Sequence, residues 1–216
     1  MKNYSVMDQA LEFLTPYGPD LRNGLTNHAP MAVEALAALG RADAVMPWLE
    51  RYSKGMLPRP VAHSPINADE WRAALGNEAR FADWHLFFEH ELKNASWPTV
   101  LALWTERLTS GFCASAMHGI IRVGHAVRSL GEAETPARIR ELAAGLAYWG
   151  AAYQTLPTAH TETPSAPGQA TRMQKRPSAR GASQARTDAC ACACRPPRTR
   201  HGRRARFAPA RSAGSS

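Results

Sequence analysis

The distribution of aliphatic residues confines any folded core to the first three quarters of the chain. No Leu, Ile or Val follows Leu156. A segment without these residues cannot bury enough apolar surface to offset the entropy that ordering costs. We therefore predict a globular domain over residues 1–158 and a disordered tail, rich in Arg, Ala, Pro and Ser, over residues 159–216.

The tail also carries the positive charge of the chain. Residues 161–216 hold 12 Lys and Arg against 2 Asp and Glu, whereas residues 1–160 hold 14 against 16. The net charge of +8 therefore does not describe the domain, and nucleic-acid binding rests on the tail alone. Its cysteines, Cys190, Cys192 and Cys194, alternate with Ala, which is unlike the paired spacing of zinc sites.

Two interpretations of this tail stay open. An Ala- and Arg-rich stretch without periodicity is what a GC-rich gene encodes when it is translated in a shifted frame, and we favour such a shift near residues 155–162. The alternative is a genuine basic tail or linker.

The composition of the domain excludes several protein classes. No apolar run approaches the roughly 20 residues of a membrane span, and the first residues lack the apolar stretch of a signal peptide. Cys113 is the one cysteine before residue 160, so no disulfide framework holds the fold. We expect a cytoplasmic protein with no membrane partner.

Helix signals recur along the domain, and strand signals are nearly absent. Apolar residues at helical spacing are separated by Pro, Gly and capping residues, and no sustained two-residue alternation is present. We predict an all-α fold, a multi-helix array of about eight helices, with residues 56–67 as a loop. The helices are expected at 7–14, 30–39, 43–54, 69–75, 78–94, 97–108, 112–130 and 136–153.

The helix expected at 112–130 carries two histidines. On a helical wheel its apolar face consists of Cys113, Met117, Ile120, Gly124 and Val127, and its polar face of Ser115, Arg122 and Ser129. His118 and His125 lie about 20° apart at the border, separated by about 10.5 Å of helix rise. Two histidines at this separation do not share one metal ion directly. Either one binds a metal while the other lines the same channel, or both bond to neighbouring residues.

Common cofactor signatures are missing from the sequence. It contains no G-x-G-x-x-G after a strand, no phosphate-binding G-x-x-x-x-G-K-[ST] and no G-x-S-x-G. It also contains no Glu-x-x-His, which disfavours a carboxylate-bridged di-iron site.

Three sequence blocks together resemble the questin oxidase-like family. The first is N-H-x-P-M at residues 27–31, followed by A-L-x-x-L-G at 35–40. The second is W-R-A-A-L-G at 71–76, and the third is H-G-x-I-R at 118–122 with Ala126 four residues later. The order of the blocks, continued by L-A-Y-W at 146–149, carries the resemblance over residues 7–157.

The resemblance implies an all-helical oxidoreductase that acts on aromatic polyketide-type rings with O2. It implies either a Baeyer–Villiger-type monooxygenase that uses NADPH or a ring-cleaving oxygenase with mononuclear non-haem iron. His28 and His118 become the implied metal ligands, which suits the affinity of imidazole for iron. Arg122 is the implied group that orients a phenolate or carboxylate, and His125 the implied supporting residue beside the metal.

Family members are longer, and the tail stands where their C-terminal half would be. Two histidines leave an iron site incomplete, since even an open facial triad has three protein ligands. We expect this truncated chain to be impaired or inactive and to expose apolar residues such as Leu142, Leu146 and Trp149. The alternative function is a non-catalytic helical scaffold whose basic tail binds nucleic acid or acidic partners.

Overall fold

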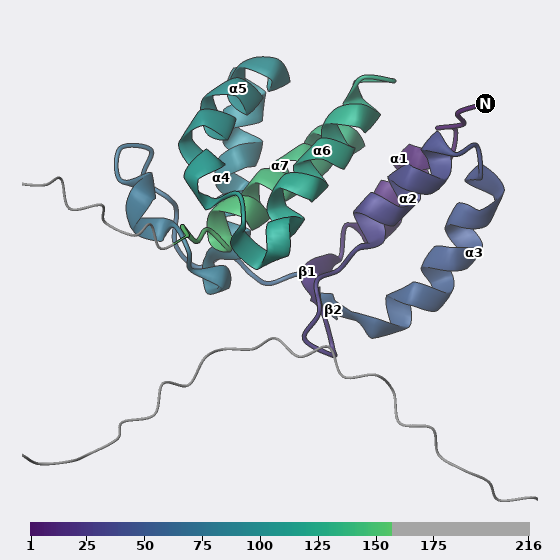
Figure 1. Ribbon diagram of the computed structural model, residues 1–216, viewed down its shortest axis with the longest axis horizontal. Coiled ribbons are helices and arrows are strands. Elements are labelled where there is room, and N and C mark those ends of the chain that lie inside the picture. The colour runs from purple at the N-terminus through teal and green to yellow at the C-terminus, as the bar shows by residue number, and fades with distance from the viewer. Residues whose placement is uncertain (157–216) are drawn as a thin grey trace, which may run out of the picture. The chain divides into compact units, whose positions relative to one another are not determined.

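The computed structural model describes residues 1–156, which fold mainly into helices (Figure 1). The mostly helical fold is confirmed. The predicted disorder of residues 159–216, the shifted frame and the tail cysteines lie outside the described residues. Within those residues the helices are α1 (Met7–Leu14), α2 (Ala29–Ala38), α3 (Ala42–Tyr52), α4 (Phe81–Asn94), α5 (Trp97–Leu108), α6 (His118–Leu130) and α7 (Pro136–Ala151). No helix in this part of the chain has the length and apolar character needed to cross a membrane.

A small antiparallel sheet accompanies the helices and corrects the expectation that residues 56–67 form only a loop. It pairs β1 (Tyr17–Leu21) with β2 (Met56–Pro58), and an irregularity interrupts the register between Tyr17 and Leu21. Strands of five and three residues are too short to show an alternating pattern. The start of the segment 56–67 is therefore a strand rather than a loop.

The helix expected at 112–130 begins only at His118. Ser115, Ala116 and Met117 have φ values of 46°, 51° and 67°, which lie in the left-handed region that β-carbons disfavour. These three left-handed residues lie within the 3₁₀ turn Ala114–Met117, and the chain kinks there before α6 begins. The short helix expected at 69–75 is likewise a 3₁₀ turn, Trp71–Ala74.

The buried face of α6 differs from the face that the wheel predicts. Ile120 and Ile121 are exposed, whereas Arg122 and Ser129 are buried with Val123 and Ala126. The wheel assumed that charged residues face water, but the buried Arg122 has a carboxylate partner within the fold.

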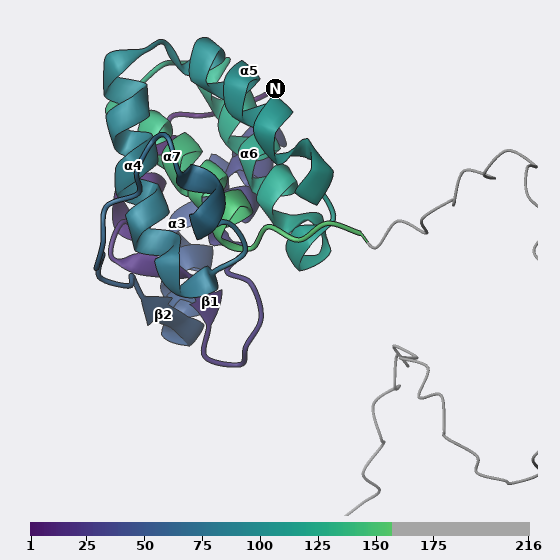
Figure 2. The same cartoon turned by 90° about the vertical axis from the view of Figure 1, so that its left-hand side faces the viewer.

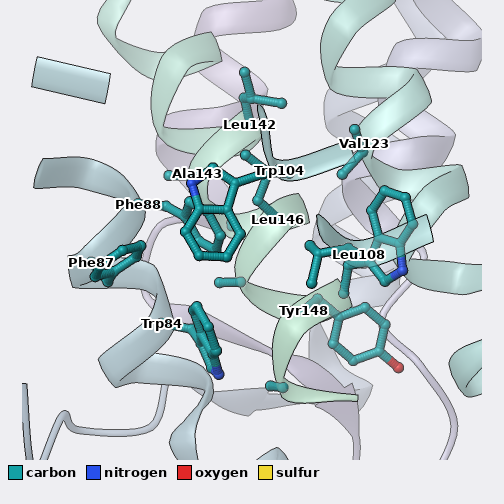
Figure 3. Packing of buried hydrophobic residues seen from close by; sticks show 14 of the residues in the cluster. Trp84, Phe87, Phe88, Trp104, Leu108, Val123, Leu142, Ala143, Leu146 and Tyr148 are labelled. Carbon is teal, nitrogen blue, oxygen red and sulfur yellow. The ribbon is translucent and has the colours of Figure 1, made fainter. Parts of the chain in front are cut away.

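The long helix α7 forms the centre of the larger core. It packs against α4 and α6 (Figure 1, Figure 2), and every residue from Glu141 to Ala151 is buried. Figure 3 shows Trp84, Phe88 and Trp104 gathered next to α7. The smaller core cluster lies among α1, α2 and α3, around residues such as Val33 and Leu49.

The prediction that Leu142, Leu146 and Trp149 are exposed is wrong. These side chains are 0%, 0% and 1% exposed, because α4 and α6 cover α7. The large apolar side chains left at the surface include Met117, Ile120 and Ile121 instead.

Candidate functional site

The two histidines that the family resemblance implies as metal ligands meet in the structure. The Nε2 atoms of His28 and His118 lie 2.8 Å apart. Their rings are nearly perpendicular, with an angle of 87° between the planes and 4.7 Å between the centroids. His28 is exposed and His118 is half-buried, so the pair is open to solvent.

Backbone carbonyls fix the protonation of both rings. Nδ1 of His28 lies 2.7 Å from the carbonyl oxygen of Thr26, and Nδ1 of His118 lies 2.5 Å from that of Ser115. A carbonyl oxygen only accepts, so each Nδ1 donates its proton to it. In the neutral rings both Nε2 atoms then carry lone pairs only 2.8 Å apart, and a cation bound by both nitrogens removes the repulsion.

This arrangement fits half of a metal centre. Histidine ligands characteristically donate the second ring N–H to a backbone carbonyl or a carboxylate, which orients the ring. Two nitrogens bound at right angles to one ion, each at about 2.1 Å, lie about 3 Å apart, close to the 2.8 Å seen here. Residues 1–156 contain no group of three or more His, Cys, Asp or Glu side chains placed to bind one ion. The described part of the chain would therefore offer such an ion two histidine ligands.

Local backbone structure positions each histidine. His28 is the residue before α2, and its backbone N–H donates to the hydroxyl of Tyr52 in α3. His118 opens α6 directly after the left-handed residues, which bring the carbonyl of Ser115 back to its ring. Both histidines therefore stand at the starts of helices that pack against each other.

His125 binds Glu34 rather than the histidine pair. Its Nδ1 donates to Oε2 of Glu34 at 2.5 Å, two helical turns beyond His118. Glu34 is fully buried and also accepts hydrogen bonds from Tyr4 and Arg128. The contact fixes the tautomer of His125 and leaves its Nε2 free to accept a proton.

The environment of Glu34 keeps its carboxylate ionised. Burial raises the pKa of Glu34, but hydrogen bonds from Arg128, Tyr4 and His125 outweigh it and hold that pKa below its usual range. Burial and the hydrogen bond to Glu34 raise the pKa of Tyr4 to about 12. The cluster therefore combines one carboxylate with the guanidinium of Arg128 and a neutral phenol at ordinary pH.

Arg122 forms a buried ion pair with Glu141 on α7. Its Nε and terminal nitrogen donate to the two carboxylate oxygens at 2.6 and 2.9 Å, and the residue is 7% exposed. In this position the guanidinium faces α7 instead of the solvent beside His118. An orienting role for Arg122 toward substrate requires that this pair opens.

Sequence reasoning missed Glu34 as part of this region. It is the one charged residue between Leu25 and Gly40. The rest of that segment has the pattern of an apolar helix. A lone carboxylate in such a segment signals a buried charge with a partner, but its partners lie 91 and 94 residues away. Only the fold brings them together.

Comparison with known families supports the resemblance found in the sequence. The family model described as Questin oxidase-like matches residues 25–195. The chain belongs to this questin oxidase-like family. The match includes His28, Glu34, His118, Arg122 and His125, and it begins after α1 and β1. The chain matches no curated protein and no solved structure.

Membership in the questin oxidase-like family indicates an oxidoreductase-type function. The matched region also continues past residue 156, where the described residues end. The shifted frame and the truncation stay predictions, since residues 157–216 lie outside the described part of the chain.

Proposed function

We propose that this chain is an oxidoreductase that inserts oxygen into, or cleaves, an aromatic polyketide-type ring, with His28 and His118 holding a non-haem metal ion. The observation that carries the proposal is the pair of Nε2 atoms 2.8 Å apart, each with its Nδ1 bound to a backbone carbonyl. Bound iron would supply Lewis acidity and activation of O2. Because His28 is exposed and His118 is half-buried, substrate and solvent could reach an ion held by this pair.

The residues around the pair suit an aromatic substrate. Met117 and Ile121 are exposed, the first next to His118 and the second one turn along α6. Apolar surface beside the reacting centre orients a flat ring by burying it. The proposed role of these side chains is therefore to bind the ring over the histidine pair.

His125 is the proposed proton acceptor. Glu34 holds the proton on Nδ1 of His125, so the lone pair is on Nε2. His125 belongs to the same helix as His118. A carboxylate that orients a histidine and stabilises its charged form is a recurrent arrangement for general base catalysis. NADPH is a further co-substrate that the family resemblance implies, and we assign no described residue to it.

Metal binding tests the proposal directly. The purified 216-residue chain should bind one equivalent of Co²⁺, with visible absorption bands from histidine ligation. His28→Ala and His118→Ala should each abolish these bands, while His63→Ala, which changes an exposed loop histidine, should retain them. Co²⁺ bands that survive in both variants would place the metal elsewhere, for example on the cysteines of residues 190–194.

O2 consumption tests the reaction. Because we expect the truncated chain to be impaired, the Fe²⁺-loaded chain should consume O2 only slowly in the presence of a hydroxyanthraquinone, with or without NADPH. Both histidine variants should lose this residual activity. Intact metal binding without O2 consumption would favour the alternative, a helical scaffold. The charge of residues 161–216 supports that alternative, and salt-sensitive DNA retention that disappears on deleting 161–216 would establish it.

A further inference from the structure

A small polar cavity lies where α1, β1, α6 and α7 come together. Its volume is about 20 Å³, and its lining includes Asn27, Arg59, Arg122, Arg140 and Glu141. A space of this size holds one water molecule or one ion of similar radius. The histidine pair is not part of its lining.

The lining of the cavity carries more positive than negative charge. Three arginines face one glutamate. Glu141 neutralises Arg122 in the buried pair described above, and Arg140 pairs with Glu12 near the surface. Arg59 forms no ion pair with any carboxylate of residues 1–156. Arg59, which is half-buried, is therefore left without a counter-charge among residues 1–156.

One donor of Arg59 also lacks a hydrogen-bond acceptor. Its Nε is buried and has no partner within the described residues, although a buried donor without an acceptor is costly. Burial and the charge of Arg122 lower the pKa of Arg59, but a guanidinium stays protonated in proteins. The group therefore needs an acceptor that also carries negative charge.

The neighbouring elements do not supply that charge. Nδ1 of His85 on α4 lies 3.4 Å from a terminal nitrogen of Arg59. Burial and the charge of Arg59 lower the pKa of His85 to about 3, so the imidazole is neutral. Glu89, also on α4, lies 3.9 Å from Nδ1 of His85 and forms no ion pair with Arg59.

We propose that this cavity binds a small monovalent anion of the size of chloride, with Arg59 as its main ligand. The positive charge of Arg59 favours an anion over water in the cavity. Water would accept the hydrogen bond from Nε but would leave the charge of the guanidinium without a counter-charge. The volume is enough to admit a halide. The inference is independent of the metal proposed at His28 and His118.

The anion stabilises the segment that carries His28. Arg59 directly follows β2, and its backbone N–H donates to the carbonyl of Pro16 at 2.8 Å. Asn27, on another wall of the cavity, donates to the carbonyl of Gly18 and accepts from the N–H of Ala29. A bound anion therefore links the end of β2 to α7 and to the turn before α2.

Halide-dependent stability tests the proposal on the full chain. At constant ionic strength, the unfolding midpoint should be higher in sodium chloride than in sodium gluconate, because a ligand of the native state stabilises it by mass action. Arg59→Gln should abolish this chloride dependence. Arg51→Gln, which changes an exposed arginine on α3, should retain it and so controls for binding to surface and tail arginines.

Two results would overturn the proposal. One is a wild-type chain whose midpoint is equal in the two salts, and the other is a chloride dependence that persists in Arg59→Gln. If Arg59→Gln does not fold, crystals of the wild-type chain soaked in sodium bromide give the same decision. Anomalous scattering from bromide beside Arg59 supports the site, and a cavity without it rejects the site.

Discussion

The Nε2 atoms of His28 and His118 lie 2.8 Å apart although the residues are 90 positions apart in the sequence. The same two helices meet again farther along, where Glu34 of α2 binds His125 and Arg128 of α6. Since the contacts follow the same order on both helices, α2 and α6 run in the same direction (Figure 1). The two helix starts therefore converge on the histidine pair, and the buried carboxylate fixes their register.

Two glycines of α6 should respond in opposite ways to the same substitution. A Cβ at Gly119 would lie 2.8 Å from the Cα of Trp149, whereas a Cβ at Gly124 would meet nothing within 4 Å. Gly119→Ala should therefore lower the free energy of unfolding by about 1–3 kcal/mol through overpacking. Gly124→Ala should raise it by about 0.5–1 kcal/mol, because alanine favours helix. Urea denaturation measures both, and equal effects would contradict the close packing of α6 on α7.

The buried pair of Arg122 and Glu141 should show strong coupling. Arg122→Met leaves the Glu141 carboxylate buried without its partner, so the free energy of unfolding should fall by about 3–5 kcal/mol. The double variant Arg122→Met with Glu141→Leu should lose much less than the sum of the two single changes. A double-mutant cycle from denaturation curves measures this coupling. Additive losses would mean that the two groups do not form the pair.

Helix starts marked by proline were predictable from the sequence, because the signal is local. Trp97-Pro98 and Thr135-Pro136 open α5 and α7 at the expected residues, and Thr135 caps α7 by accepting from the N–H of Arg138. The helical fold follows from such signals together with the apolar spacing. The meeting of His28 with His118 was not predictable from spacing, and only the family resemblance pointed to both.

The buried face of α6 was not predictable for a different reason. A helical wheel assumes that charged side chains face water. In the fold, Arg122 pairs with Glu141 on α7 and Arg128 pairs with Glu34 on α2. Such pairs depend on the fold and override the local pattern. The left-handed residues before α6 also lack the glycine that would have indicated them.

His85 should make the fold sensitive to mild acid. Its pKa is lowered from 6.5 to about 3 in the fold by burial and by Arg59, so unfolding takes up a proton below pH 6.5. Its contribution to stability is present above that pH and is lost as pH falls toward 3, at up to about 1.4 kcal/mol per pH unit. Denaturation curves between pH 7 and pH 4 measure the slope.

The variant His85→Gln should flatten this slope, while His63→Gln, in an exposed loop, should leave it unchanged. An unchanged slope in His85→Gln would assign the acid sensitivity to other groups. Glu34 affects stability only at lower pH, because its depressed pKa preserves its contribution until pH falls below about 4.5.

The left-handed segment before α6 should be stabilised by glycine without loss of the histidine geometry. Ala116 is exposed and has a φ of 51°, which costs an alanine about 1–2 kcal/mol. Glycine relieves this strain but adds entropy to the unfolded chain, so Ala116→Gly should raise the free energy of unfolding by about 0.5–1 kcal/mol. Ala95→Gly is the matched control, because Ala95 is exposed with a φ of −142°, and it should lower stability instead.

Since the carbonyl of Ser115 still reaches Nδ1 of His118, Ala116→Gly should bind Co²⁺ as the wild-type chain does. A stabilised variant that no longer binds Co²⁺ would show that the strained backbone itself positions His118.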